Sequence, residues 1–291
     1  MTRRARGAKR WEQDLGHGAT LALLTPASAL LALAFLVPLV WLVWVSLTDP
    51  SAGPHGYAQL VDRGVARRAF ENTAVTSAIV TAVSVAVGAF LAWELRGARS
   101  TLYRGLLWAT LLFPLWTSVI VRNYALTIIL QRNGVLNDFL TGVGFVGDPV
   151  DVLYTRTAVV VGMVHSMVPY AALPLYAAFV LIDEDLLWAA RSLGASRTRA
   201  MSSVVLPLAL PSLIVAATLV FVVSVGFYVT PTVLGGPRNL FVATFIDQEV
   251  NQLFDVPGAA VASVVLVVGG LAVVLVTTLL VGWRRVERSL S

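Results

Sequence analysis

Few side chains in this sequence have the types and spacing that chemistry needs. The chain has no Cys and only three His, which leaves no thiol chemistry, no disulfide and no Cys-based metal site. It contains no G-x-x-x-x-G-K-[ST], H-E-x-x-H or G-x-S-x-G pattern. We therefore expect no catalytic residues, no bound cofactor and no metal. What remains is a small set of ionisable and polar residues inside apolar segments.

Arg122, His165 and Glu94 are the ionisable residues within or at the edge of those segments. Ionisable groups at such positions are functional candidates by default. Arg122 falls near one end of its segment, so it either snorkels to the interface or lines a pathway, and both readings stay open. A lone His such as His165 is more often a hydrogen-bonded packing residue. Deep carboxylates are missing, which argues against a proton-coupled carrier.

The elements that must position these residues are membrane spans. The chain is 57% apolar and 13% charged, with a mean hydropathy of +0.80, whereas a soluble domain carries about 25% charged residues. We therefore expect an all-α integral membrane protein. Six segments each approach the ~20 residues that cross a bilayer. They are Leu21–Leu47, Thr73–Leu95, Leu106–Leu130, Thr157–Ile182, Leu208–Leu234 and Ala259–Trp283.

The basic residues predict the orientation of the spans. Fourteen of the 21 Lys and Arg residues fall on one side of the predicted membrane and six on the other. Cytoplasmic loops carry the excess of Lys and Arg, so both termini are predicted to be cytoplasmic, and the net charge of +5 does not indicate a nucleic-acid partner. We predict a cytoplasmic tail over 1–19, a transmembrane domain over 20–285 and a second cytoplasmic tail over 286–291.

Helix breakers recur inside the predicted spans, notably Pro114, Gly226 and Pro231. Broken helices often line solute pathways. Polar residues near the breaks are candidates for such a lining, although hydrogen bonding between helices explains any single one at least as well. They are Ser224, Tyr228, Thr230 and Thr232 in the fifth span, and His165, Ser166 and Tyr170 in the fourth.

The longest polar interruption between spans on the predicted cytoplasmic side begins at Asp183. Acidic residues open a short helix, where the positive end of the helix dipole favours them. Gly194 suits the left-handed conformation that ends a helix, and Ser196 can cap a second short helix that carries Arg197 and Arg199. This helix–Gly–helix elbow is either a docking surface or an ordinary loop, and the pattern alone favours neither.

The same stretch resembles the permease subunits of binding-protein-dependent ATP-binding-cassette importers. Their signature is E-A-A, three residues, Gly, nine residues and I-x-L-P. Ala189 and Ala190 match the alanines, Gly194 the glycine, and Val204–Pro207 the last part, while Trp188 replaces the glutamate. RNYALTIILQRNGVLND (122–138) and GFYVTPTVLGGP (226–237) look like the spermidine/putrescine branch.

The resemblance implies a type I importer fold in the bacterial inner membrane. The loop 183–207 would couple to a cytoplasmic ATPase dimer that hydrolyses ATP. An extracytoplasmic binding protein would deliver the solute, and a second permease, favoured as a different chain, would complete the pathway. The implied coupling residues are Ala189, Ala190, Arg191, Gly194, Ala195, Ser196 and Pro207.

A polyamine is a cation, so a path for it should offer aromatic faces or carboxylates. The candidates for the substrate pathway are Arg122, Tyr124, His165, Tyr170, Tyr228, Asp247 and Glu249. Related family members import iron complexes, phosphonates or other small solutes. The alternatives to an importer subunit are a secondary transporter or channel that works without an ATPase, and a membrane scaffold without transport.

Overall fold

The protein is built from helices, five of which are long and apolar enough to cross a membrane. The computed structural model describes residues 17–50 and 53–290, and all regular structure in these residues is helical. A bent helix pair brings the number of spans to six if the pair is counted as one. The predicted all-α membrane fold is therefore confirmed. The tail expected over 1–19 lies mostly outside the described residues, and the last helix continues to Leu290, through the segment expected as a C-terminal tail.

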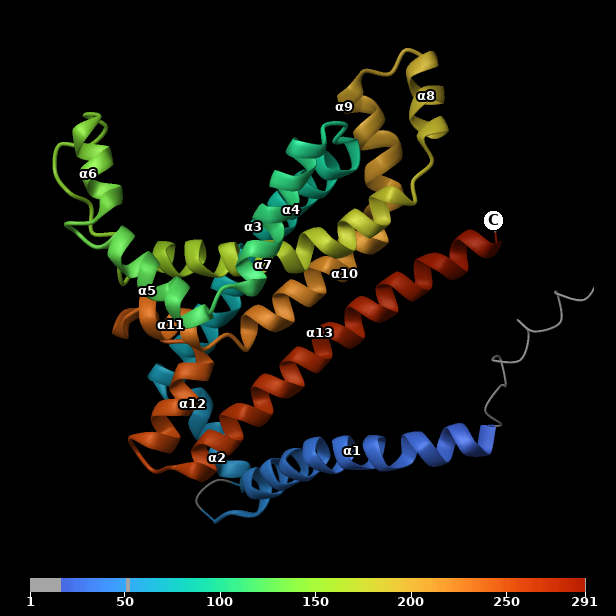
Figure 1. Ribbon diagram of the computed structural model, residues 1–291. Helices are drawn as coiled ribbons and strands as arrows, with labels where there is room; N and C mark the ends of the chain where they lie inside the picture. Colours follow the sequence, from blue (N-terminus) through green and yellow to red (C-terminus); the bar gives the residue numbers. More distant parts are fainter. Residues whose placement is uncertain (1–16, 51–52, 291) are drawn as a thin grey trace, which may run out of the picture.

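The helices are labelled in Figure 1. Their bounds are α1 (His17–Thr48), α2 (Gly53–Asp62), α3 (Gly64–Gly97), α4 (Thr101–Trp116), α5 (Val119–Leu130), α6 (Val135–Gly142), α7 (Arg156–Val180), α8 (Glu184–Ser192), α9 (Arg197–Ala200), a π-helical turn (Met201–Val205), α10 (Leu206–Val225), α11 (Val229–Leu234), a 3-10 turn (Pro237–Asn239), α12 (Val242–Asn251) and α13 (Val256–Leu290).

The centre of the molecule is the contact between α3 and α7, which pack on one another more extensively than any other two helices among the described residues. Gly88 of α3 permits this approach, because a Cβ there would lie 2.9 Å from both the Cβ of Ala171 and the backbone nitrogen of Ala172. Helix α10 packs against both α3 and α7. Buried side chains of α3, α5, α7, α10 and α11 form one apolar core around this centre.

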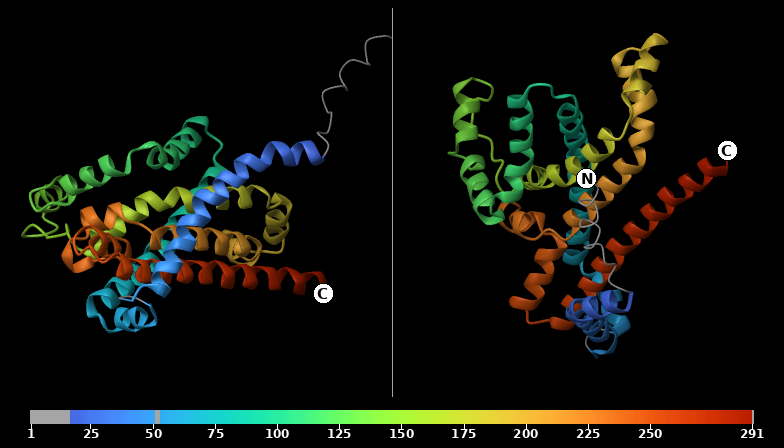
Figure 2. Two further views of the ribbon diagram at one scale, coloured as in Figure 1. Left: turned by 90° about the horizontal axis from the view of Figure 1, so that it is seen from below. Right: turned by 45° about the vertical axis from the view of Figure 1, so that its right-hand side comes forward.

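Two ends of the molecule can be distinguished in Figure 1. The loop between α8 and α9, the start of α1 and the end of α13 lie toward the right, which we call the elbow end. Helices α2, α6, α11 and α12 lie toward the left, at the opposite end. Toward the elbow end α13 diverges from α10, as the right-hand view of Figure 2 also shows.

Two of the expected spans are broken. The segment predicted as one span over Leu106–Leu130 is divided at Thr117 and Ser118, and the chain turns by 106° between Thr101–Trp116 and Val119–Gly142. The sequence marks Pro114 as a helix breaker in this span, and the structure places the break three residues later. The residues at the break are extended, and Pro114 has no N–H to continue the ladder. The fifth span ends at Val225, and the short helix α11 follows after Gly226.

Candidate functional site

The elbow between α8 and α9 is shaped by local hydrogen bonds. The Asp183 carboxylate accepts the N–H of Asp185 at 3.0 Å and caps α8. Gly194 has φ +86° and ends the helix. The N–H of Ala195 donates to the carbonyl of Ala190 at 3.0 Å, and the N–H of Gly194 donates to that of Arg191 at 2.9 Å. This is the Schellman arrangement, in which the left-handed residue turns the chain back on the helix. The predicted cap at Gly194 is confirmed.

The second half of the elbow differs from the two short helices that the sequence predicts. The Oγ of Ser196 accepts the N–H of Arg199 at 3.3 Å, as expected of a cap. The following helix does not stop, however, because α9 passes through the π-helical turn directly into α10. Pro207 lies at the start of α10 and cannot donate to Ser203, so a wider turn lets the helix pass the missing hydrogen bond. The elbow is therefore continuous with a membrane span.

The elbow exposes large apolar side chains among its charged ones, and no described residue covers them. No residue of α8 is buried. Leu193 is 90% exposed and Trp188 is 60% exposed. The Arg191 guanidinium lies 5.6 Å from the centre of the Trp188 ring, within reach of a cation–π contact. Trp188, which replaces the glutamate of the signature, thus holds Arg191 from the next turn of the helix.

Arg122 is buried beneath the break between α4 and α5. Its side chain is 9% exposed, so it does not reach the interface by snorkelling. Its Nη2 donates to the carbonyls of Pro114 at 2.7 Å and Thr117 at 3.0 Å. Its Nη1 donates to Ser166 Oγ on α7 at 2.6 Å. The carbonyls at the end of α4 carry partial negative charge. They stabilise the positive charge of the guanidinium, a role that a carboxylate has in an ordinary ion pair.

A cavity of about 100 Å³ adjoins Arg122. Ser166, Tyr170 and Phe227 also line it, so two of the predicted pathway residues meet there. His165 and Tyr124 have exposed side chains outside this group. The structure therefore brings Arg122 together with Tyr170 and leaves His165 and Tyr124 on the surface of the isolated chain.

Tyr228 and Asp247 form a second polar group beside the break at Gly226. The Tyr228 hydroxyl interacts with the Asp247 carboxylate. Asn251 holds the same carboxylate through a hydrogen bond from Nδ2 to Oδ1 at 2.7 Å. Tyr228 is 40% exposed and Asp247 is partly exposed. This group offers a carboxylate and an aromatic ring to a solute at the end opposite the elbow.

Glu249 lies two residues from Asp247 but is turned into the protein. Its side chain is 5% exposed, and its Oε2 lies 3.5 Å from Nη1 of Arg63. The same arginine lies 3.7 Å from Oδ2 of Asp255. Burial raises the pKa of the Glu249 carboxyl, Arg63 opposes that rise and Asp255 adds to it. The carboxylate therefore joins α12 to the start of α3. Sequence reasoning missed Arg63 as its partner, since 186 positions separate the two.

No metal site emerges from the described part of the chain, where no three His, Asp or Glu side chains are grouped to hold an ion. A fold of membrane-crossing helices, with broken spans and an exposed elbow that continues into a span, defines a multi-pass membrane protein.

Comparison with known proteins identifies the class. Residues 84–286 match the family model "Binding-protein-dependent transport system inner membrane component", and the chain belongs to this family. It is similar to the spermidine/putrescine transport system permease protein PotB of Escherichia coli, with 32% identity over 206 residues, which cover 71% of this chain and 73% of that protein. PotB of Haemophilus influenzae is 33% identical over 61% of this chain and 62% of its own length.

Solved structures share the fold. A chain of a bacterial ABC transporter that imports alginate superposes with a TM-score of 0.76 at 21% identity, covering 91% of this chain and 95% of that chain. A chain of the MetNI methionine transporter superposes with a TM-score of 0.54, covering 77% of this chain and 95% of that chain. The protein is thus an inner-membrane transport subunit rather than an enzyme, and the ATPase of such a transporter is a separate subunit.

Proposed function

We propose that this chain is the permease subunit of a polyamine importer driven by ATP. The observation that carries the substrate class is the 32% identity over 206 residues to a spermidine/putrescine permease. The group of Tyr228 and Asp247 supports it, because an aromatic face and a carboxylate are the groups that bind an alkylammonium. Spermidine and putrescine are therefore the first substrates to test.

The elbow couples the chain to a cytoplasmic ATPase dimer. Its exposed apolar side chains, above all Leu193, fit a groove on another protein better than water. Gly194, Ala195 and Ser196 set the angle of the elbow, and Ala189, Ala190 and Arg191 lie on the helix that docks. Closure of the dimer on ATP displaces the elbow. Pro207 lies at the start of α10, where the displacement of the elbow is passed on to this membrane span.

The other partners follow from the same assignment. A second, different permease supplies the other half of the pathway, and an extracytoplasmic binding protein delivers the polyamine to the end that carries α6, α11 and α12. This arrangement places both termini in the cytoplasm. The positive-inside bias supports it, as does the position of the start of α1 and the end of α13 toward the same end as the elbow in Figure 1.

Reconstitution in proteoliposomes tests the proposal. The assembled transporter, with its ATPase and binding protein, should take up labelled spermidine or putrescine only with ATP. Uptake by the purified chain alone under an ion gradient would instead indicate a secondary transporter or channel. ATP-driven uptake of an iron complex or a phosphonate, without uptake of a polyamine, would contradict the proposed substrate class. It would still agree with the proposed coupling to an ATPase.

A further inference from the structure

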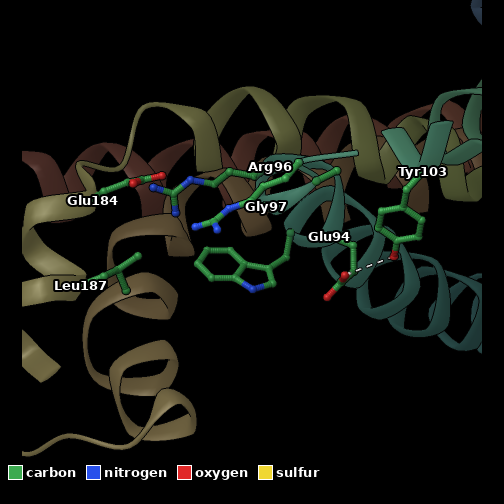
Figure 3. Close-up of a pocket in the computed structure, with 9 residues that line it drawn as sticks. Glu94, Arg96, Gly97, Tyr103, Glu184 and Leu187 are labelled. Carbon is green, nitrogen blue, oxygen red and sulfur yellow. Dashed lines mark hydrogen bonds between the residues drawn. The ribbon is translucent and has the colours of Figure 1, made fainter. Parts of the chain in front are cut away.

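A second cavity lies at the elbow end, where the turn between α3 and α4 meets the first turn of α8. It has a volume of about 330 Å³. Trp93, Glu94, Arg96 and Arg99 come from the α3 side, Tyr103 from α4 and Glu184 from α8. In Figure 3, Glu184 and Leu187 lie at one side of this cavity, and Glu94 and Tyr103 lie at the other. The transport assignment uses none of them.

Several walls of this cavity are held by contacts within the protein. The Tyr103 hydroxyl donates to Glu94 Oε2 at 3.2 Å, which Figure 3 marks. The Arg96 guanidinium donates to the carbonyl of Ile182 at 2.6 Å and lies 5.2 Å from the centre of the Trp93 ring. Trp93 in turn meets Phe179 of α7 edge to face, with ring centres 5.8 Å apart. The positions of these groups are therefore fixed before any ligand arrives.

Two other residues that line the cavity have no partner among the described residues. Arg99 and Glu184 are exposed and form no hydrogen bond or ion pair within residues 17–50 and 53–290. The cavity thus presents the unpaired cation of Arg99 and the unpaired anion of Glu184. Glu94 and Arg96 also line it, but each is already bound by another residue of the protein. A purely anionic ligand would be repelled by two carboxylates, and a purely cationic one by two guanidiniums. A ligand that carries one positive and one negative group can pair with a carboxylate and with a guanidinium at the same time.

The position of the cavity indicates the source of such a ligand. It lies where the candidate membrane span α3 ends and where α4, the first part of the bent pair, begins, and Trp93 and Tyr103 are the residue types enriched at the membrane interface. Basic side chains between membrane helices at this depth bind lipid phosphates. The carboxylates add a partner for a primary ammonium, which donates three hydrogen bonds.

We propose that this cavity binds the headgroup of an ethanolamine phospholipid, with its phosphate at Arg99 and Arg96 and its ammonium at Glu184. The bound headgroup bridges the α3–α4 turn and the first turn of α8, so it braces the base of the elbow. The proposal needs only that α3 crosses the bilayer, and it does not depend on the identity of the transported solute.

The test measures lipid retention by the assembled transporter. The complex is placed in nanodiscs of equal parts phosphatidylethanolamine and phosphatidylglycerol, extracted gently, and its bound lipids are counted by mass spectrometry. We expect the wild type to enrich the ethanolamine lipid. Glu184→Gln should reduce that preference about fivefold, the change expected for the loss of about 1 kcal/mol. Arg99→Gln should reduce retention of both lipids.

Matched controls use exposed residues at the opposite end. Asp138→Asn with Asp148→Asn, and Arg68→Gln, should leave the lipids unchanged. Equal retention of both lipids by the wild type would overturn the proposal, as would an equal loss in the control variants. Displacement of the lipid by free phosphoethanolamine would show a soluble ligand, and displacement by spermidine an amine site; either result overturns the assignment to a lipid. Gel filtration of each complex excludes failure to assemble as the cause.

Discussion

The Nη1 of Arg122 donates a hydrogen bond of 2.6 Å to the Oγ of Ser166, which lies 44 positions later in the chain. Through this bond and two to the end of α4, one side chain joins both sides of the broken third span to α7. Arg122→Gln should cost about 2–4 kcal/mol of stability, since it leaves buried acceptors unpaired. Ser166→Ala should cost about 1 kcal/mol. Thermal unfolding in detergent measures both.

Arg132→Gln is the control for Arg122. Its guanidinium pairs with Asp151 at 3.2 Å, but both side chains are exposed, and such pairs contribute about 0–1 kcal/mol. Equal destabilisation by the two arginine substitutions would contradict a bracing role for Arg122.

Gly88→Ala should destabilise the contact of α3 with α7. The new methyl group would come within 2.9 Å of the Ala172 backbone nitrogen, which cannot move aside as a flexible side chain can. Overpacking of this kind costs about 1–3 kcal/mol. Gly105→Ala on α4 is the control, because nothing lies within 4 Å of its added Cβ and alanine favours a helix. Denaturant unfolding should give a lower free energy of unfolding than wild type for Gly88→Ala, and an equal or higher one for Gly105→Ala.

Gly194→Val should uncouple ATP hydrolysis from uptake more than Gly194→Asn does. The space around Gly194 is open, so the obstacle is its φ of +86°, which Asn tolerates and a β-branched residue does not. We expect Gly194→Val to lower polyamine-stimulated ATPase activity several-fold at unchanged permease content. Gly144→Val introduces similar strain at φ +76° in a loop far along the chain from the elbow, and it should leave coupling intact. Normal coupling in Gly194→Val would refute the role of this turn.

Asp247→Asn should raise the spermidine concentration for half-maximal uptake about tenfold, as the loss of about 1.4 kcal/mol requires. The carboxylate is the charged member of the group that includes Tyr228. Transport assays with the wild-type binding protein measure the effect. Asp148→Asn, an exposed carboxylate elsewhere, should be silent. An unchanged uptake curve in Asp247→Asn would remove this residue from the pathway.

Glu249→Gln should flatten the dependence of stability on pH. Burial raises the pKa of Glu249 in the folded state, so the folded protein holds this proton more tightly than the unfolded chain. The resulting stability is fully present below the ordinary pKa of a glutamate, and it is lost as the pH rises through the raised value. Melting temperatures across that range should fall less in Glu249→Gln than in wild type, while Glu71→Gln, an exposed glutamate, should follow the wild type.

Sequence reasoning reached what local chemistry determines. The six apolar segments follow from composition, and the turn at Gly194 follows from a helix cap built by residues a few positions apart. It named Pro114 as a helix breaker but did not locate the sharp bend at Thr117, because proline is tolerated within many spans and the guanidinium that binds the freed carbonyls comes from Arg122 in the next helix. Nor could it separate Asp247 from Glu249, since the difference lies in Arg63, which is distant in the chain.

The uninterrupted passage from α9 through the π-helical turn into α10 has a mechanical consequence. Residues Thr198–Val225 form one rod of 28 residues, roughly 40 Å long at 1.5 Å per residue. Its far end meets the break at Gly226, and the short helix α11 beyond that break packs on α5. A displacement of the elbow would therefore be carried along one continuous helix to the point where the two broken spans meet.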